Sequence, residues 1–288
     1  MDGPARSSSR TGRLLAGCAP LAGKERTLSW LSVTDDLQLA ADLVRTAGQL
    51  AATMLADGLR VQHKTSVSDV VSAADHAAEE LVVSGLRAAR PADGVVGEEG
   101  TELPGERVWF IDPVDGTYNF LSGLPYWCSA LALAERSDGG WVPLLGAVYH
   151  PVADELWLGG VDHPTSCNGV PVPPLADAPL AELSLACYLH PASMSDETVR
   201  QPALAALAGA ATVRMLGSGS VELAAVAGGR LGAWLQRNPP GWDWLPGAAL
   251  VTAAGGQAEV LEQRGQRWHI AGNARAVTDL RQLLAEQA

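Results

Sequence analysis

The part of the chain that most constrains its fold is one acidic stretch, Trp109-Phe110-Ile111-Asp112-Pro113-Val114-Asp115-Gly116-Thr117-Tyr118-Asn119. Its first residues are aromatic or β-branched and predict a buried strand, which we expect to stop at Asp112 because Pro113 cannot donate to a ladder. A second carboxylate, a turn-forming glycine and a hydroxyl residue that could open a helix follow. Carboxylates this close repel each other unless a hard cation such as Mg²⁺ lies between them. The stretch therefore predicts a loop for a metal ion and a phosphate, with a plain Asp-Gly turn as the alternative.

Composition sets limits on possible partners. The 288 residues can bury a substantial core in one or two domains, and 32 acidic against 20 basic side chains leave a net charge of −12. No basic stripe is present that could follow a phosphate backbone, which argues against nucleic acid as a partner. A phosphate ligand would then need local positive charge, and bound metal ions would supply it.

The cysteines and the apolar segments indicate the compartment in which the protein is expected. Four scattered cysteines form no Cys-x-x-Cys pair, so neither a zinc site nor a disulfide framework is indicated, and a reducing cytoplasm is expected. No stretch approaches the roughly 20 apolar residues that a membrane span requires. Residues 1–33 lack a hydrophobic core followed by a cleavage site, and we expect them to form a loose tail.

The first half of the chain predicts two helices against an antiparallel sheet. Apolar residues with helical spacing run from Asp35 to Gly58, and a second helix begins after Ser72 and ends before Pro91. A short strand at 94–97 comes before the central stretch. The later strands are close enough in sequence for a meander and cover residues 127–135, 141–149 and 155–158.

The second half follows a proline-rich segment at 164–179 and alternates strands with helices, which predicts a sheet with helices on both faces. The predicted strands cover residues 184–188, 212–216, 231–235 and 257–261, and the helices cover 197–208, a segment from Ser220, 244–254 and 274–287. No internal repeat is visible. We therefore expect a tail over 1–33, an N-terminal α+β subdomain over 34–163 and a C-terminal α/β subdomain over 164–288 that completes the active site.

Four weaker motifs also have ordinary structural explanations. Asp75 could complete a capping box with Ser72, and the pair Glu98-Glu99 could be a solvated surface. The segment 216–220 ends a strand and opens a helix, where backbone N–H groups could meet an anion or a hydroxyl-rich ligand. Asp243 could be the N-cap of the apolar helix that follows it.

The order of these motifs is more specific than any one of them. Gly97-Glu98-Glu99, the stretch 112–117, Trp242-Asp243 and Ala254-Gly255-Gly256 together resemble the inositol monophosphatase family of Mg²⁺-dependent phosphatases. The segment 69–75, preceded by Lys64, is similar to the upstream acidic motif of that family. The resemblance covers roughly residues 36 to 286. It implies an α/β (α+β) fold, a layered αβαβα sandwich.

The resemblance also implies roles for individual residues. A first Mg²⁺ would be held by Glu98, Asp112 and the Val114 carbonyl. A second would be held by Asp112, Asp115 and Asp243. A third, weaker ion could bind near Glu98, and Mn²⁺ is a possible substitute for Mg²⁺. Thr117 and Asp75 would orient the attacking water. The residues expected to contact the substrate are Asp115, Gly116, Thr117, Gly217, Ser218, Gly219, Gln236 and Asp243.

The implied activity is Mg²⁺-dependent hydrolysis of a small polyol or sugar phosphate by metal-activated water, without a covalent enzyme intermediate. Two features depart from the inositol phosphatases. Gln236 stands where they usually have an acid, and Trp244-Leu245-Pro246-Gly247 replaces smaller residues. Histidinol phosphate and 3′(2′),5′-bisphosphate nucleotides are therefore alternative substrates. We also expect a homodimer.

Two other classes of protein share part of this pattern. Haloacid-dehalogenase-like phosphatases also end a strand with Asp-Gly-Thr, but one residue separates their two aspartates, whereas two residues separate Asp112 from Asp115. A non-enzymatic protein that binds metal or a phosphometabolite is the second alternative. Inactive relatives generally lose a ligand or the threonine, and this chain keeps them all.

Overall fold

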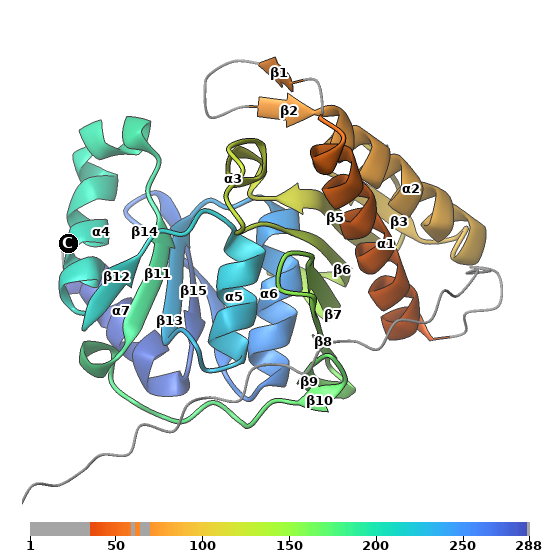
Figure 1. The fold of residues 1–288 in the computed structure, drawn as a ribbon. Helices are drawn as coiled ribbons and strands as arrows, with labels where there is room; N and C mark the ends of the chain where they lie inside the picture. The colour runs from red at the N-terminus through yellow and green to blue at the C-terminus, as the bar shows by residue number, and fades with distance from the viewer. Residues whose placement is uncertain (1–34, 59–60, 64–69, 287–288) are drawn as a thin grey trace, which may run out of the picture.

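The computed structural model describes residues 35–58, 61–63 and 70–286. Helices and sheets alternate in layers, in the order helix, sheet, helix, sheet, helix (Figure 1). The α-helices are α1 (Asp36–Ala56), α2 (Ala73–Ala89), α3 (Thr117–Leu121), α4 (Glu197–Ala208), α5 (Gly219–Ala227), α6 (Gly241–Ala253) and α7 (Ala274–Glu286). The predicted αβαβα class is confirmed.

The first sheet has eight strands in the order β10-β9-β8-β7-β6-β5-β3-β4. Only the pair β3–β5 is parallel in this sheet, and its other pairs are antiparallel, as the close spacing of the strands predicted. The strands are β3 (Gly94–Gly97), β4 (Glu102–Leu103), β5 (Arg107–Asp115), β6 (Cys128–Ser137), β7 (Gly140–His150), β8 (Glu155–Gly160), β9 (His163–Cys167) and β10 (Val170–Pro171). A separate antiparallel pair joins β1 (Val61–His63) to β2 (Val70–Ser72).

The second sheet has five strands in the order β12-β11-β13-β15-β14. In it β11 is parallel to both of its neighbours, whereas β15 is antiparallel to β13 and β14. The strands are β11 (Ser184–Tyr188), β12 (Thr212–Arg214), β13 (Ala233–Arg237), β14 (Gln257–Gln263) and β15 (Gln266–Gly272), and the connections contain 3₁₀ turns η2 (Leu180–Glu182) and η3 (Pro191–Ser195).

Three apolar layers hold the sheets and helices together. Side chains of α1 and α2, including Leu39, Leu43 and Leu86, pack on one face of the first sheet. The apolar helices α5 and α6 fill the space between the two sheets, and α4 and α7 cover the outer face of the second sheet. The first turn of α5 meets the end of β5, where the Ser220 N–H donates to the Asp115 carboxylate.

The path of the central strand corrects one prediction. β5 does not stop at Asp112 but runs to Asp115. Its register with β6 shifts between Asp112 and Asp115, and Pro113 lies inside this irregular segment. A bulge needs no ladder hydrogen bond from its extra residue, so a proline there does not end the strand.

Other differences concern boundaries and cysteines. The predicted subdomain boundary after residue 163 falls within β9, and the first sheet ends only at Pro171, so the division into subdomains stays a prediction. Residues 1–33 lie outside the described residues. Cys167 is disulfide-bonded, which the scattered spacing of the cysteines did not indicate, whereas Cys128 and Cys187 are free thiols. None of the helices in the described part of the chain is long and apolar enough to cross a membrane.

A polar network ties α1 and the end of α2 to the first sheet. The Arg107 guanidinium donates to the Asp93 carboxylate at 2.7 and 3.2 Å, and Trp109 Nε1 donates to the same carboxylate at 2.9 Å. Asp36 in α1 accepts from Arg107 at 2.8 Å and from Arg90 at 2.6 Å.

We predict that Asp93→Asn lowers the free energy of unfolding by about 1–2 kcal/mol, because the amide would place an N–H group against donors. Urea unfolding at neutral pH measures this. Asp138→Asn, in the exposed turn between β6 and β7, is the matched control and should leave the midpoint unchanged. Equal midpoints for both variants would contradict the prediction.

Candidate active site

Acidic side chains from distant parts of the chain converge at one end of the first sheet. Asp112 and Asp115 lie at the end of β5, and Glu98 lies in the turn after β3. Asp75 and Asp243 lie in the first turns of α2 and α6. The charges of the other four acids all raise the pKa of Asp112. The structure therefore brings these five predicted residues together.

Strand pairing explains why Glu98 and Asp112 lie side by side. The parallel pair β3–β5 aligns Gly97 with Ile111, and the next residue on each strand is an acid. The Glu98 N–H donates to the Ile111 carbonyl at 3.1 Å, which continues this alignment into the turn. The sequence spacing could not show this, because it depends on which strands are neighbours.

Asp112 is at the centre of the cluster. Its carboxyl group shares hydrogen bonds with those of Glu98 and Asp243, and its Oδ1 atom is buried with no hydrogen-bond partner. Burial, and then the charges of Glu98, Asp115 and Asp243, raise the pKa of Asp112 well above its ordinary range. Without a cation, these carboxyl groups can be this close only by sharing protons.

The flanking acids respond in the same way. Crowding by surrounding protein atoms, followed by the charges of Asp243, Asp75 and Glu99, raises the pKa of Glu98 to about 8, although Glu98 is exposed to solvent and water will reduce this shift. Burial and the charge of Asp115 raise the pKa of Asp243 to about 8. Asp243 is not the N-cap of α6, a position held by Pro240, so the simple capping explanation is wrong.

These observations fit a divalent cation. Among the described residues, no three His, Cys, Asp or Glu side chains are placed so that they could hold a metal ion without moving. Carboxyl groups that share protons lie closer together than the ligands of one ion, so ion binding would require these side chains to separate. The acceptor-only oxygens and the unsatisfied Oδ1 of Asp112 are the donor set that Mg²⁺ prefers.

Asp115 links this cluster to the second half of the chain. Its Oδ2 atom accepts a hydrogen bond from the Ser220 N–H at 2.5 Å, in the first turn of α5. Burial raises the pKa of Asp115, and hydrogen bonds from Ser220, Ser218 and Gly219 oppose that rise. The predicted contact segment 217–219 therefore lies directly beside a predicted metal ligand.

Gly116 is required by both conformation and space. Its φ of 95° is in the left-handed region, and a β-carbon there would lie 3.0 Å from the Gly217 carbonyl oxygen. Asn119 of α3 clamps the same segment, because its Nδ2 donates to the Leu216 carbonyl at 2.8 Å and to the Tyr126 carbonyl at 2.9 Å. The sequence assigned Asn119 no role, because its contact with the segment 216–220 is to Leu216, 97 residues away.

The remaining predicted residues lie around this cluster. Thr117 Oγ1 donates to the Val114 carbonyl at 2.9 Å, which joins two predicted site residues. The side-chain oxygen of Gln236 lies 4.0 Å from where a β-carbon on Gly219 would stand. Gln236 therefore lies near the segment that is expected to contact the substrate. Lys64 and Asp69 fall outside the described residues.

Glu222 is a second residue to which sequence reasoning gave no role. It is buried in α5, and its carboxylate accepts from the Leu216 and Gly217 N–H groups at 2.9 and 3.3 Å and from Trp234 Nε1 at 2.9 Å. Burial raises its pKa to about 7, and these donors oppose that rise. Through these hydrogen bonds Glu222 holds the main chain at the start of the segment 216–219.

The comparison with protein families decides the assignment. The model of the inositol monophosphatase family matches residues 33–287. The chain belongs to this family. Histidinol-phosphatase of Streptomyces coelicolor is 36% identical over 247 residues, which cover 80% of this chain and 88% of that protein. Inositol monophosphatase 3 of Solanum lycopersicum is 30% identical over 259 residues, or 86% and 93% of the two chains.

Solved structures support the same family assignment. The extragenic suppressor protein suhB of Bartonella henselae superposes with a TM-score of 0.77 at 27% identity, covering 87% of this chain and 98% of that one. The IMPase of Thermotoga maritima has a TM-score of 0.74 at 25% identity. Members of the family are metal-dependent hydrolases of phosphate monoesters, so the predicted enzyme class is confirmed. The haloacid-dehalogenase-like alternative is thereby set aside.

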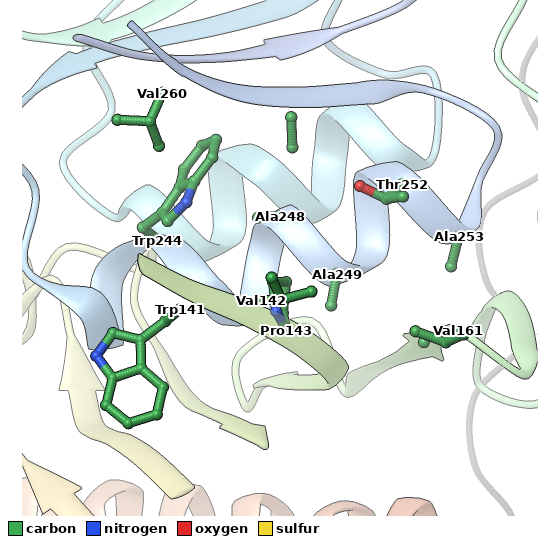
Figure 2. Close-up of a pocket in the computed structure, with 12 residues that line it drawn as sticks. Trp141, Val142, Pro143, Val161, Trp244, Ala248, Ala249, Thr252, Ala253 and Val260 are labelled. Atoms are coloured by element: carbon green, nitrogen blue, oxygen red, sulfur yellow. The ribbon is translucent and has the colours of Figure 1, made fainter. Parts of the chain in front are cut away.

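A separate cavity of about 480 Å³ lies between β7, α6 and β14 in this family member (Figure 2). Its lining is apolar and includes Trp141, Val161, Trp244 and Val260. No acidic side chain lines it, so it is distinct from the carboxylate cluster.

The raised pKa values predict how stability depends on pH in the metal-free protein. The pKa values of Glu98 and Asp243 rise from ordinary values of 4.5 and 3.8 to about 8. Between these limits the folded state binds more protons than the unfolded state, so the free energy of unfolding should fall as pH rises from about 4 to about 8.

Mg²⁺ should replace the shared protons and should therefore raise Tm more at pH 8 than at pH 5. Thermal unfolding in chelator and in Mg²⁺ at both pH values measures this. Asp112→Asn is the control and should reduce the difference. A rise in Tm with Mg²⁺ that is the same at both pH values would contradict the prediction.

Proposed function

We propose that this protein is an Mg²⁺-dependent phosphatase that hydrolyses a small polyol or sugar phosphate. The observation that carries the proposal is the contact of Glu98, Asp112 and Asp243 through shared hydrogen bonds. Such a cluster of acceptors would repel an anionic substrate unless cations were bound to it. The family assignment supports the same conclusion.

Particular residues would hold the ions. Glu98, Asp112 and the Val114 carbonyl would bind one Mg²⁺, and Asp112, Asp115 and Asp243 a second, with a third near Glu98 and with Mn²⁺ as a substitute. Bound Mg²⁺ would neutralise the phosphoryl oxygens and make an attacking water more acidic. Asp112 would contribute to both sites, which accounts for its position between Glu98 and Asp243.

Other residues would position the reactants. The Thr117 hydroxyl donates to the Val114 carbonyl, so its oxygen is oriented to accept a hydrogen bond from water. Asp75, buried in α2 near Glu98 and Asp112, would accept the second hydrogen bond of that water. Gly116 and Thr117 carry the main-chain N–H groups where the phosphate would bind. With this arrangement a single in-line displacement requires no protein nucleophile.

The alcohol part of the substrate would contact Gly217, Ser218, Gly219 and Gln236. At position 236 the inositol phosphatases usually have an acidic residue, whereas the neutral Gln236 amide can both donate and accept hydrogen bonds. A second candidate is histidinol phosphate, which is favoured by the 36% identity to the protein from Streptomyces coelicolor named histidinol-phosphatase. A 3′(2′),5′-bisphosphate nucleotide is a third. We further propose that the protein is a cytoplasmic homodimer.

The metal proposal predicts that Asp112→Asn lowers kcat/KM by two or more orders of magnitude, because it removes a carboxylate oxygen from both ion sites. Phosphate release from inositol 1-phosphate, histidinol phosphate and a nucleoside bisphosphate, with and without chelator, measures it. Asp138→Asn is the matched control on the surface. Full turnover in excess chelator would refute the proposal.

The position of Gln236 predicts a change of specificity. Gln236→Glu should raise kcat/KM for inositol 1-phosphate relative to a nucleoside bisphosphate, because an added charge disfavours the more anionic substrate. One polar contact corresponds to about 1 kcal/mol, or several-fold. The ratio of kcat/KM values at fixed Mg²⁺ tests this, with Gln263→Glu on β14 as the control. An unchanged ratio would show that Gln236 does not face the substrate.

A further inference from the structure

We propose that Glu79, which is not itself a metal ligand, positions Glu98 for metal binding. Glu79 lies in α2 and is only 3% exposed. Its Oε2 atom accepts from the Glu99 N–H at 2.8 Å, and its Oε1 atom accepts from the Thr101 N–H at 3.2 Å and from the Thr101 hydroxyl at 2.6 Å. These donors belong to the turn that carries Glu98.

The hydrogen bonds use both oxygens of the Glu79 carboxyl group. Each of its oxygens faces a main-chain N–H group, which can only donate. A glutamine could accept from only one of these two N–H groups, although its amide N–H could donate to the Thr101 hydroxyl. Leaving a buried donor unsatisfied is costly, so glutamine should displace one end of the turn.

The turn is held between α2 and β5. On one side the Glu98 N–H donates to the Ile111 carbonyl of β5 at 3.1 Å. On the other side Glu79 holds the next residue, Glu99. Glu98 therefore lies between two fixed main-chain positions, and its carboxyl group is held against Asp112. Without the hydrogen bonds to Glu79, the turn that carries Glu98 would be held only through its contact with β5.

Gly97 shows that the approach of Glu79 is close. A β-carbon on Gly97 would overlap the Glu79 carboxylate. That carboxylate cannot move aside without loss of its hydrogen bonds to Glu99 and Thr101. Gly97→Ala should consequently disturb the same turn, although it changes no polar group.

This inference rests on the proposed function and predicts a specific defect in metal binding. Glu79→Gln should weaken Mg²⁺ binding by about 10- to 100-fold, the range typical of groups that orient a metal ligand. Isothermal titration calorimetry with Mg²⁺ alone measures this without substrate. The Mg²⁺ concentration for half-maximal phosphate release should rise by a similar factor, and kcat at saturating Mg²⁺ should stay near that of the wild type.

Three further variants make the test specific. Thr101→Val removes one hydroxyl donor and should weaken Mg²⁺ binding several-fold. Thr101→Ser keeps that hydroxyl and should bind Mg²⁺ as the wild type does. Glu80→Gln changes the exposed neighbour on the same helix and should bind Mg²⁺ as the wild type does. If Glu79→Gln fails to fold, as judged by circular dichroism, the two Thr101 variants decide the question.

The possible outcomes separate the two proposals. Wild-type Mg²⁺ affinity in both Glu79→Gln and Thr101→Val would overturn the role of Glu79. A fall in kcat at saturating Mg²⁺ with unchanged affinity would overturn it as well. If the wild type binds Mg²⁺ but releases no phosphate from any monoester, the proposed function fails, and a weaker affinity in the variants would still support the role of Glu79.

Discussion

The repulsion among buried carboxylates is the constraint on which the rest of this structure depends. Asp112 is in hydrogen-bond contact with both Glu98 and Asp243, and Asp115 lies close by. Charged groups so near one another are stable only if protons or cations lie between them. The architecture brings them together nevertheless, through the parallel pair β3–β5 and through the first turn of α6. Such an arrangement sacrifices stability of the metal-free protein in favour of ion binding.

The same cluster joins the two halves of the fold. Asp115 of the first sheet accepts from Ser220 of α5, and Asn119 of α3 holds the carbonyl of Leu216. Gly116 has no β-carbon, and the segment at Gly217 approaches to the distance that this allows. The loop 115–119 and the segment 216–220 are therefore fixed to each other by these contacts. The proposed site would depend on both halves of the fold.

The sequence was sufficient for what depends on local pattern. Helix α4 and strand β11 have the predicted bounds, because apolar spacing and turn residues determine them. It was insufficient where tertiary contacts decide. Pro113 ended the predicted strand, but a bulge accommodates it. The carboxylate of Glu79 meets partners 20 and 22 residues away, and no periodic pattern marks such a contact.

The buried acids of this protein fall into two kinds that sequence alone does not distinguish. Glu79 and Glu222 accept hydrogen bonds from main-chain N–H groups, so their buried oxygens have partners within the protein. Asp112 faces other carboxyl groups instead, and its buried Oδ1 atom has no hydrogen-bond partner. The proposed cations would therefore be needed only by the second kind. The first kind holds main-chain segments beside the cluster, so under the proposed function acidic side chains would serve both to bind ions and to hold the segments around them.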